Sequence, residues 1–237
     1  TLPADIQTGY RSGKKCIEAW NTYATLPATL EDGQSTLEVL PLLSRDYSFD
    51  KGCCTRHKVF RNCRSGKQHQ TDSTRTTTWP GFPEQLVMDE ELGWLMGLFA
   101  AEGSATQKQV TLSLSISEQD LAARFIAGMQ SKFSVEFKPY PRPERNLLEL
   151  VAHHTALACL LKSLCGAGAA HKHVPEVIMQ GTQEARAGFL RGVLDGDGSS
   201  TRPRFTFGVA SPKLAWGVRT LMATTENKWG TVGTMED

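Results

Sequence analysis

The chain has 237 residues, a formal net charge of +1 and 40% hydrophobic residues. This length allows one large or two small globular domains, and the near-neutral charge means that any binding of nucleic acid must depend on local basic patches. The sequence contains no transmembrane or signal segment, and its six cysteines without such a signal favour reduced thiols in an intracellular protein. We therefore expect no membrane partner and no secretion.

Residues 1–50 predict short β-strands joined by turns. Residues 16–20 and 36–40 are strand-like, and the Asp-Gly pair within residues 29–33 is typical of a hairpin turn. In this order, the segments resemble the N-terminal half of an intein splicing (Hint) domain.

The chain also departs from the intein pattern. Thr1 is not the usual Cys or Ser, and the sequence shown lacks the closing His-Asn pair. Residues 40–43 stand where inteins carry Thr-x-x-His, and the nearby His57 lacks a threonine three residues before it. We expect that this polypeptide does not splice by itself. It is a fragment, a degenerate intein, or not an intein.

Residues 51–78 form a basic segment with Asp72 as its only acid. Its basic residues are Lys51, Arg56, Lys58, Arg61, Arg64, Lys67 and Arg75. Such a segment attracts a phosphate backbone with strong salt dependence, although a solvated basic loop has the same composition. We assign contact with DNA to Lys58, Arg61 and Arg64. The cysteines and histidines of this segment match no structural zinc spacing, so we expect reduced thiols there.

An apolar stretch occurs twice, at residues 92–104 and 187–199, after a rigid linker at residues 79–83. Each copy carries glycines four residues apart and ends in an acid, a glycine and a serine. A glycine inside a helix costs about 1 kcal/mol relative to alanine, so the spacing indicates that two helices approach each other closely. The helix-packing residues are Gly93, Gly97, Gly188 and Gly192. Gly103 and Gly198 are predicted to end these helices in the left-handed conformation.

The acids Glu102 and Asp197 fall in register in the two copies. A carboxylate at the C-terminus of a helix is placed unfavourably by about 0.3–1 kcal/mol. If the helices pack side by side and parallel, the two acids converge beside main-chain carbonyls, such as those of Ala101 and Gly196. Such oxygen donors suit Mg²⁺. Two acids that only solvate helix ends are the alternative.

Residues 107–117 alternate between apolar and polar, which predicts a half-buried strand. Its polar face could contact base edges, because a β-ribbon fits the major groove, or it could face solvent only. We expect a helix over residues 118–133, a hairpin of residues 135–138 and 146–152, and a helix over residues 155–164. The proposed DNA contacts of this half are Gln109, Thr111, Ser113, Ser115, Lys138, Arg142 and Arg145.

Lys172 lies in a loop shortly before the second copy. A lysine there could stabilise charge on a scissile phosphate, or it could only cap the helix expected from Val174. After the second copy, residues 202–209 alternate again and place Arg202, Arg204 and Thr206 on one face, which suits guanine edges or phosphates. We expect a helix over residues 212–223 after this strand. Because few residues remain beyond that helix, the second half is either truncated or abbreviated.

The paired stretch resembles the motif of the LAGLIDADG homing endonucleases in their two-motif, single-chain form, over residues 86–216. The resemblance implies an α/β (α+β) fold of two pseudo-symmetric half-domains (αββαββα-like) that form a DNA-binding saddle. The domains would be a mostly β region at 1–85, a first half-domain at 86–170 and a second at 171–237. Lys172 resembles the lysine of the Lys-x-Ile-Pro element in intein-borne members.

The resemblance also implies a monomeric double-strand DNA endonuclease with an internal pseudo-twofold axis, carried within an intein whose flanking host segments (exteins) would be further partners. Glu102, Asp197 and Lys172 would be catalytic. Mg²⁺, or Mn²⁺ in its place, would bind Glu102 and Asp197 with the carbonyls of Ala101 and Gly196 and drive phosphodiester hydrolysis at a long asymmetric site. The alternatives are a free-standing or intron-encoded endonuclease or maturase, and an inactive nucleic-acid-binding descendant.

Overall fold

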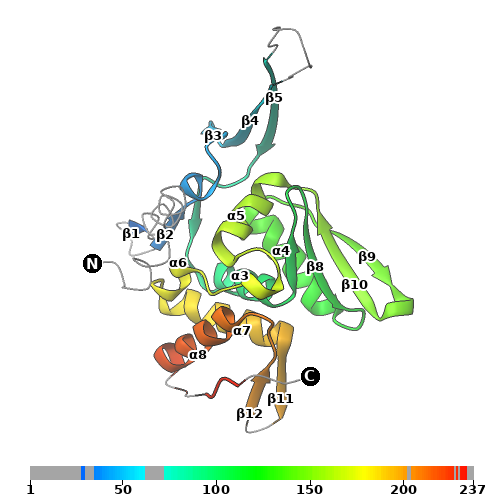
Figure 1. Cartoon of the computed structure of the whole chain (residues 1–237), viewed down its shortest axis with the longest axis vertical. Helices are drawn as coiled ribbons and strands as arrows, with labels where there is room; N and C mark the ends of the chain where they lie inside the picture. Colours follow the sequence, from blue (N-terminus) through cyan, green and yellow to red (C-terminus); the bar gives the residue numbers. More distant parts are fainter. Residues whose placement is uncertain are drawn as a thin grey trace.

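The computed structural model describes residues 28–29, 35–61, 72–201, 204–226, 228 and 230–233. The fold is mixed α/β, with antiparallel sheets arranged around and beside packed helices (Figure 1). The strand expected at residues 16–20 lies outside the described residues. Within the described ranges, none of the helices combines the length and the apolar character needed to cross a membrane.

Two helices, α3 (Glu90–Glu102) and α7 (Gln183–Asp197), pack against each other at the centre of the molecule. Each begins at a side-chain cap that satisfies a free N–H of the first turn. The Asp89 carboxylate accepts a hydrogen bond from the Leu92 N–H at 2.9 Å, and the Thr182 hydroxyl accepts one from the Ala185 N–H at 3.1 Å. In α3, every residue from 92 to 100 is buried, which explains its almost uniformly apolar sequence.

Four glycines allow main chain to touch main chain between these helices. A Cβ atom on any of them would lie about 2 Å from a carbonyl oxygen of the other helix, which no side chain tolerates. The added Cβ atom would lie 2.1 Å from the Ala185 oxygen at Gly93, 2.1 Å from the Phe189 oxygen at Gly97, 2.1 Å from the Glu90 oxygen at Gly188 and 2.2 Å from the Trp94 oxygen at Gly192. The contacts advance along both helices in the same direction and are reciprocal. The helices are therefore parallel and related by a local twofold axis.

The first copy is followed by a four-stranded antiparallel sheet in the order β7-β8-β10-β9. The strands are β7 (Gly103–Ala105), β8 (Val110–Ser115), β9 (Lys138–Arg142) and β10 (Leu147–Ala152). The helices of this unit are α4 (Gln119–Phe133) and α5 (Thr155–Cys165), with a short 3-10 turn, η2 (Pro143–Arg145). Strands β8 and β10 alternate strictly between buried and partly exposed residues, so one face of the sheet lies against the core and the other faces outward.

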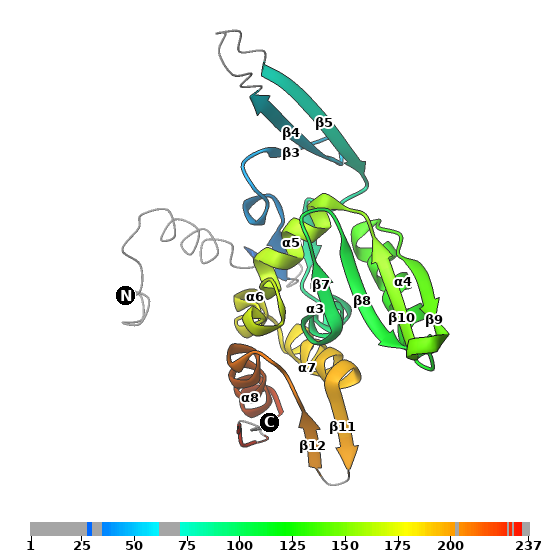
Figure 2. The ribbon, with the colours of Figure 1, turned by 45° about the vertical axis from the view of Figure 1, so that its right-hand side comes forward.

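The second copy is followed by a smaller unit. It contains β11 (Gly198–Thr201), β12 (Arg204–Phe207) and α8 (Pro212–Glu226), and it is preceded by η3 (Ala169–His171) and α6 (Glu176–Met179). Strands β11 and β12 pair with each other, and α8 packs on α7 (Figure 2). In the described part of the chain this unit has two strands where the first has four.

The N-terminal region contributes two further antiparallel sheets. One contains β1 (Ala28–Thr29), β2 (Ser35–Glu38) and β6 (Gln85–Val87), and the predicted boundary after residue 85 falls inside β6. After η1 (Leu40–Leu42), the other contains β3 (Tyr47–Asp50), β4 (Cys53–Arg61) and β5 (Asp72–Pro80). The β4–β5 ribbon projects away from the other elements (Figure 1). At its base, the Trp79 ring lies 6.0 Å from that of Tyr47 and 5.2 Å from that of His154, which precedes α5.

Two local predictions are wrong. Gly103 and Gly198 have φ values of −87° and −80° rather than the left-handed conformation, because the chain passes directly from each helix into a strand. The strand expected at residues 135–138 instead begins at Lys138 and includes Pro139 and Pro141. Proline lacks the N–H of an inner ladder but is tolerated on an edge strand, and β9 is the edge of its sheet.

Candidate functional site

The parallel packing of α3 and α7 places their last residues, Glu102 and Asp197, side by side. The helices stay in contact to this last turn, since a Cβ atom on Gly196 would lie 2.8 Å from Ala101 Cβ and 3.1 Å from Glu102 Cγ. The two carboxyl groups are close enough for each to shift the pKa of the other. Both side chains are half-buried, so water screens their mutual repulsion only in part.

This arrangement changes the protonation of both acids. Burial, followed by the charges of Asp197 and Glu118, raises the pKa of Glu102 to about 7. Burial also raises the pKa of Asp197, although its interaction with Glu102 lowers that pKa in part. Two half-buried acids in contact need either a shared proton or a cation between them. The end of the helix pair is therefore a place where a positive charge is strongly favoured.

A hard divalent cation fits the donors that are present. The carboxylate oxygens lie where the final carbonyls of two helices have no intrahelical N–H partner, and the Ala101 and Gly196 carbonyls belong to these last turns. Oxygen donors of this kind suit Mg²⁺. Among the described residues, no three or more His, Cys, Asp or Glu side chains form a metal-binding group. A cation at this pair would thus need main-chain carbonyls, water or a phosphate as further ligands.

Lys172 is buried beneath the end of α3, with 4% of its surface exposed. Its Nζ donates to the Phe99 carbonyl at 2.8 Å and lies 3.6 Å from the centre of the Phe99 ring. Burial lowers the pKa of Lys172 to about 8. Lys172 is not among the charges that shift the pKa of Glu102. Its observed contact is with the C-terminal turn of α3, and contact with a phosphate stays a prediction.

The outward face of the four-stranded sheet carries most of the neutral residues that were predicted to contact DNA. Thr111, Ser113 and Ser115 alternate with the buried residues of β8, and Gln109 Nε2 donates to Thr111 Oγ1 at 2.9 Å. Lys138 and Arg142 extend this face on β9, and Arg145 is exposed in η2. This grouping is a mixed row of donors, acceptors and cations.

Sequence analysis missed two further residues on this face. Strand register places Glu149 between Ser113 and Tyr140, and the Glu149 carboxylate accepts from Arg142 Nε at 2.8 Å. Tyr140 is 46% exposed. The signal was available in the sequence, because Glu149 is the one charged residue in the alternating segment 147–152.

The remaining predicted contacts lie on β4 and near β12. Lys58 is exposed on β4, and Arg61 ends that strand. Thr206 is exposed on β12, and Arg204 begins it. Arg64 and Arg202 lie outside the described residues. The structure therefore groups the DNA-contact predictions on the four-stranded sheet, on β12 and on the ribbon.

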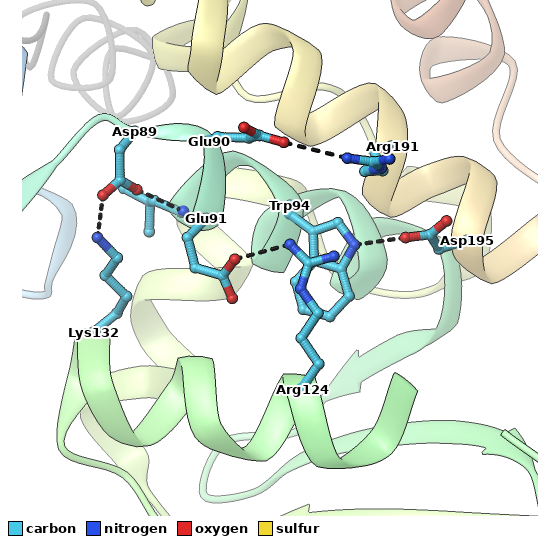
Figure 3. Close-up of polar contacts among 9 residues, drawn as sticks. Asp89, Glu90, Glu91, Trp94, Arg124, Lys132, Arg191 and Asp195 are labelled. Atoms are coloured by element: carbon cyan, nitrogen blue, oxygen red, sulfur yellow. Dashed lines mark hydrogen bonds and ion pairs between the residues drawn. The ribbon is translucent and has the colours of Figure 1, made fainter. Parts of the chain in front are cut away.

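A second group that sequence analysis missed crosses the helix pair (Figure 3). Trp94 Nε1 of α3 donates to Asp195 Oδ2 of α7 at 2.8 Å. The guanidinium of Arg124, from α4, lies 3.7 Å from the centre of the Trp94 ring and pairs with Glu91 at 2.9 Å. The signal in the sequence was a difference between the two copies, since Asp195 aligns with Ala100.

Comparisons with known proteins give partial matches. No protein-family model matches the chain. It is 32% identical over 150 residues to the ATP-dependent DNA helicase Hel308 of Thermococcus kodakarensis, a match that covers 60% of this chain and 13% of the helicase. It is 29% identical over 154 residues to a DNA polymerase of Thermococcus litoralis, which covers 62% of this chain and 9% of the polymerase. A match of 25% identity over 145 residues to the DNA-directed RNA polymerase subunit Rpo1C of Methanocaldococcus jannaschii covers 60% of this chain and 16% of the subunit.

The chain thus spans 16% or less of the length of each of these curated relatives. Among solved structures, it is similar to the N-terminal LAGLIDADG domain of DUF199/WhiA, with 15% identity and a TM-score of 0.47 over 63% of this chain and 72% of that domain. It is also similar to mesophilic variants of the homing endonuclease I-DmoI, with 14% identity and a TM-score of 0.47 over 58% of this chain and 77% of that one.

Proposed function

We propose that this chain is a LAGLIDADG-type endonuclease that cuts double-stranded DNA at a specific site with the help of a divalent cation. One observation carries the proposal. Two parallel helices, related by a local twofold axis, stay in contact to their last turns, and both end in an acid. A twofold pair of acids matches the task of cutting two strands, because the backbones of a duplex are themselves related by local twofold axes.

The residues of the site divide the chemistry among them. Glu102 and Asp197 would hold the metal, with the carbonyls of Ala101 and Gly196 as further ligands. A Mg²⁺ ion held there would supply charge that lowers the pKa of an attacking water and stabilises the leaving oxygen. Lys172 donates to the Phe99 carbonyl and so holds the last turn of α3, from which Glu102 projects. The side chains of this site hold and orient ligands, and no covalent enzyme intermediate is required.

DNA would lie across the outward faces of the two sheets. The four-stranded sheet offers Thr111, Ser113 and Ser115 to base edges and Lys138 and Arg142 to phosphates. Strand β12 would supply the second, more basic contact through Arg204 and Thr206. Because the two faces differ in sequence, the target site is expected to be asymmetric.

The comparisons support an inserted element as the setting of this chain. Its relatives carry three different names, a DNA helicase, a DNA polymerase and a subunit of an RNA polymerase, and only a small part of each is matched. A segment shared by otherwise different proteins is what a mobile intein would leave. Mass spectrometry of the natural precursor and the reading frame of its gene test this proposal. Excision with joined flanks, or a frame continuous with one host protein on both sides, would support it, and a frame that stands alone would oppose it.

Endonuclease activity is tested by incubating the protein and Mg²⁺ with a plasmid library that carries randomised inserts, and by sequencing the linear products. We expect cleavage in a recurrent sequence, and a loss of at least about 100-fold in rate for Glu102→Gln and for Asp197→Asn, since each removes a metal ligand. Glu136→Gln, at an exposed residue between α4 and β9, is the matched control.

The outcome separates the proposal from its main alternative. Linear products that do not depend on Mg²⁺ or on the two acids would contradict the assigned site. Tight binding of DNA without cleavage by the wild-type protein, measured on the same library by gel shift, would instead identify a nucleic-acid-binding descendant without nuclease activity.

A further inference from the structure

The helix pair contains a polar contact with a fully buried donor that its twofold symmetry does not repeat. Trp94 is fully buried, and its Nε1–H donates to Asp195 Oδ2 at 2.8 Å. In the alignment of the two copies, Trp94 corresponds to Phe189 and Asp195 to Ala100. The symmetry-related position is therefore apolar, with no donor and no acceptor. Like the exposed Arg191–Glu90 ion pair, the hydrogen bond has no counterpart across the local twofold axis.

The glycine contacts by themselves do not fix how far one helix has slid along the other. Gly93, Gly97, Gly188 and Gly192 bring the backbones together, but they carry no side chains that interlock. A directional hydrogen bond between Trp94 and Asp195 does fix this register, because a buried indole N–H that loses its acceptor is unfavourable. A shift of α7 by one turn would leave that N–H without its partner.

Contacts with α4 hold the indole and the helix that carries it. The Arg124 guanidinium lies over the Trp94 ring at 3.7 Å, where the ring face attracts a cation. Arg124 is itself held by Glu91 at 2.9 Å, and Lys132 of α4 pairs with Asp89, the cap of α3 (Figure 3). The indole therefore cannot turn away from Asp195 without breaking contacts between α3 and α4.

We propose that the Trp94–Asp195 hydrogen bond, with Arg124 over the indole, is a positioning device that sets the register of α7 on α3 and thereby the spacing of Glu102 and Asp197. Asp195 lies two residues before Asp197 on the same rigid helix, so a displacement of one is a displacement of the other. Asp195 also carries a negative charge near the C-terminus of α7, where a helix disfavours it. The hydrogen bond gives a reason for an acid at this position.

The test compares Asp195→Asn with Asp195→Ala. Both remove the same charge, but the asparagine carbonyl can still accept from the indole, so any difference between them isolates the hydrogen bond. Trp94→Phe removes the donor and keeps an aromatic ring, as at Phe189. Arg191→Gln is the control, since Arg191 makes an exposed ion pair with Glu90 at 3.5 Å on the same helix pair. Thermal unfolding first confirms that each variant is folded.

Two measurements on the full chain then report the register. Mn²⁺ binding, followed by electron paramagnetic resonance, rests on the proposed metal-binding function. Because positioning groups around a metal typically change affinity 10–100-fold, we expect binding about tenfold weaker in Asp195→Ala and Trp94→Phe, and wild-type binding in Asp195→Asn and Arg191→Gln. Amide NMR shifts of residues 101–103 and 196–198, recorded without metal, do not depend on that function. These amide shifts should change in Asp195→Ala and Trp94→Phe only.

The outcomes are distinguishable. Wild-type amide shifts at both helix ends in Asp195→Ala would overturn the positioning role, and so would equal displacement in Asp195→Asn and Asp195→Ala, which would assign the effect to charge. If the wild-type protein binds no Mn²⁺, the proposed metal site fails, while the amide shifts still decide the role of the hydrogen bond. If Asp195→Ala is unfolded, Trp94→Phe compared with Asp195→Asn decides it in the same way.

Discussion

Glu102 carries an electrostatic cost in the folded protein that depends on pH. Its pKa is raised from 4.5 to about 7, first by burial and then by Asp197. An acid with a raised pKa contributes its full stability below the unfolded value, near pH 4.5, and loses it as pH rises through about 7. After a discount for a side chain still partly screened by water, we estimate a cost of about 1–2 kcal/mol above pH 7.

Replacement by a neutral isostere should remove this cost. We predict that Glu102→Gln raises the free energy of unfolding at pH 8 by about 1–2 kcal/mol and leaves it nearly unchanged at pH 5, measured by urea denaturation. Glu136→Gln, on the surface, should show no such pH dependence. An equal gain at both pH values would mean that the carboxyl group of Glu102 is not shifted. Saturating Mg²⁺ should cancel the gain, because only the wild-type acid would bind the cation.

The close approach of α3 and α7 can be tested by adding a methyl group where their main chains touch. A methyl group on Gly97 would lie 2.1 Å from the Phe189 carbonyl oxygen, which is main chain and cannot rotate away. Alanine favours a helix by about 1 kcal/mol over glycine, but overpacking costs about 1–3 kcal/mol and here also separates the helices. We predict that Gly97→Ala lowers the free energy of unfolding by about 2 kcal/mol in urea denaturation. Gly208→Ala is the control, since nothing lies within 4 Å of its added Cβ atom.

Elements with strong local patterns could be predicted from the sequence. The strict alternation around Leu112 gave the correct strand, and the periodicity before Phe133 gave the correct helix. The edge strand around Pro139 could not be predicted in this way, because proline argues against a strand until its place at the edge is known. Likewise, the hydrogen bond of Trp94 to Asp195 depends on the register of two packed helices, which no local pattern specifies. The convergence of Glu102 and Asp197 could be expected because the repeat itself encodes the symmetry.

At the scale of the whole molecule, the β4–β5 ribbon extends away from the four-stranded sheet and from the β11–β12 pair (Figure 1). Lys58 and Arg75 lie directly opposite each other on this ribbon, and both are exposed. Two exposed positive charges at neighbouring positions attract a phosphate backbone. A DNA backbone that passes along the ribbon would add contacts here to those proposed for the two sheets.

This extended contact predicts a specific salt dependence. Each phosphate contact on a DNA duplex contributes about 0.9 to the slope of log affinity against log salt. We therefore predict that Lys58→Gln with Arg75→Gln lowers the slope by about 2, and weakens binding to all sequences alike, because phosphate contacts carry no sequence information. The double variant Lys162→Gln with Lys213→Gln removes the same charge from α5 and α8 and is the control. A fluorescence-anisotropy titration at several salt concentrations measures the slopes, and an equal change in both double variants would mean that the ribbon acts only through the net charge of the protein.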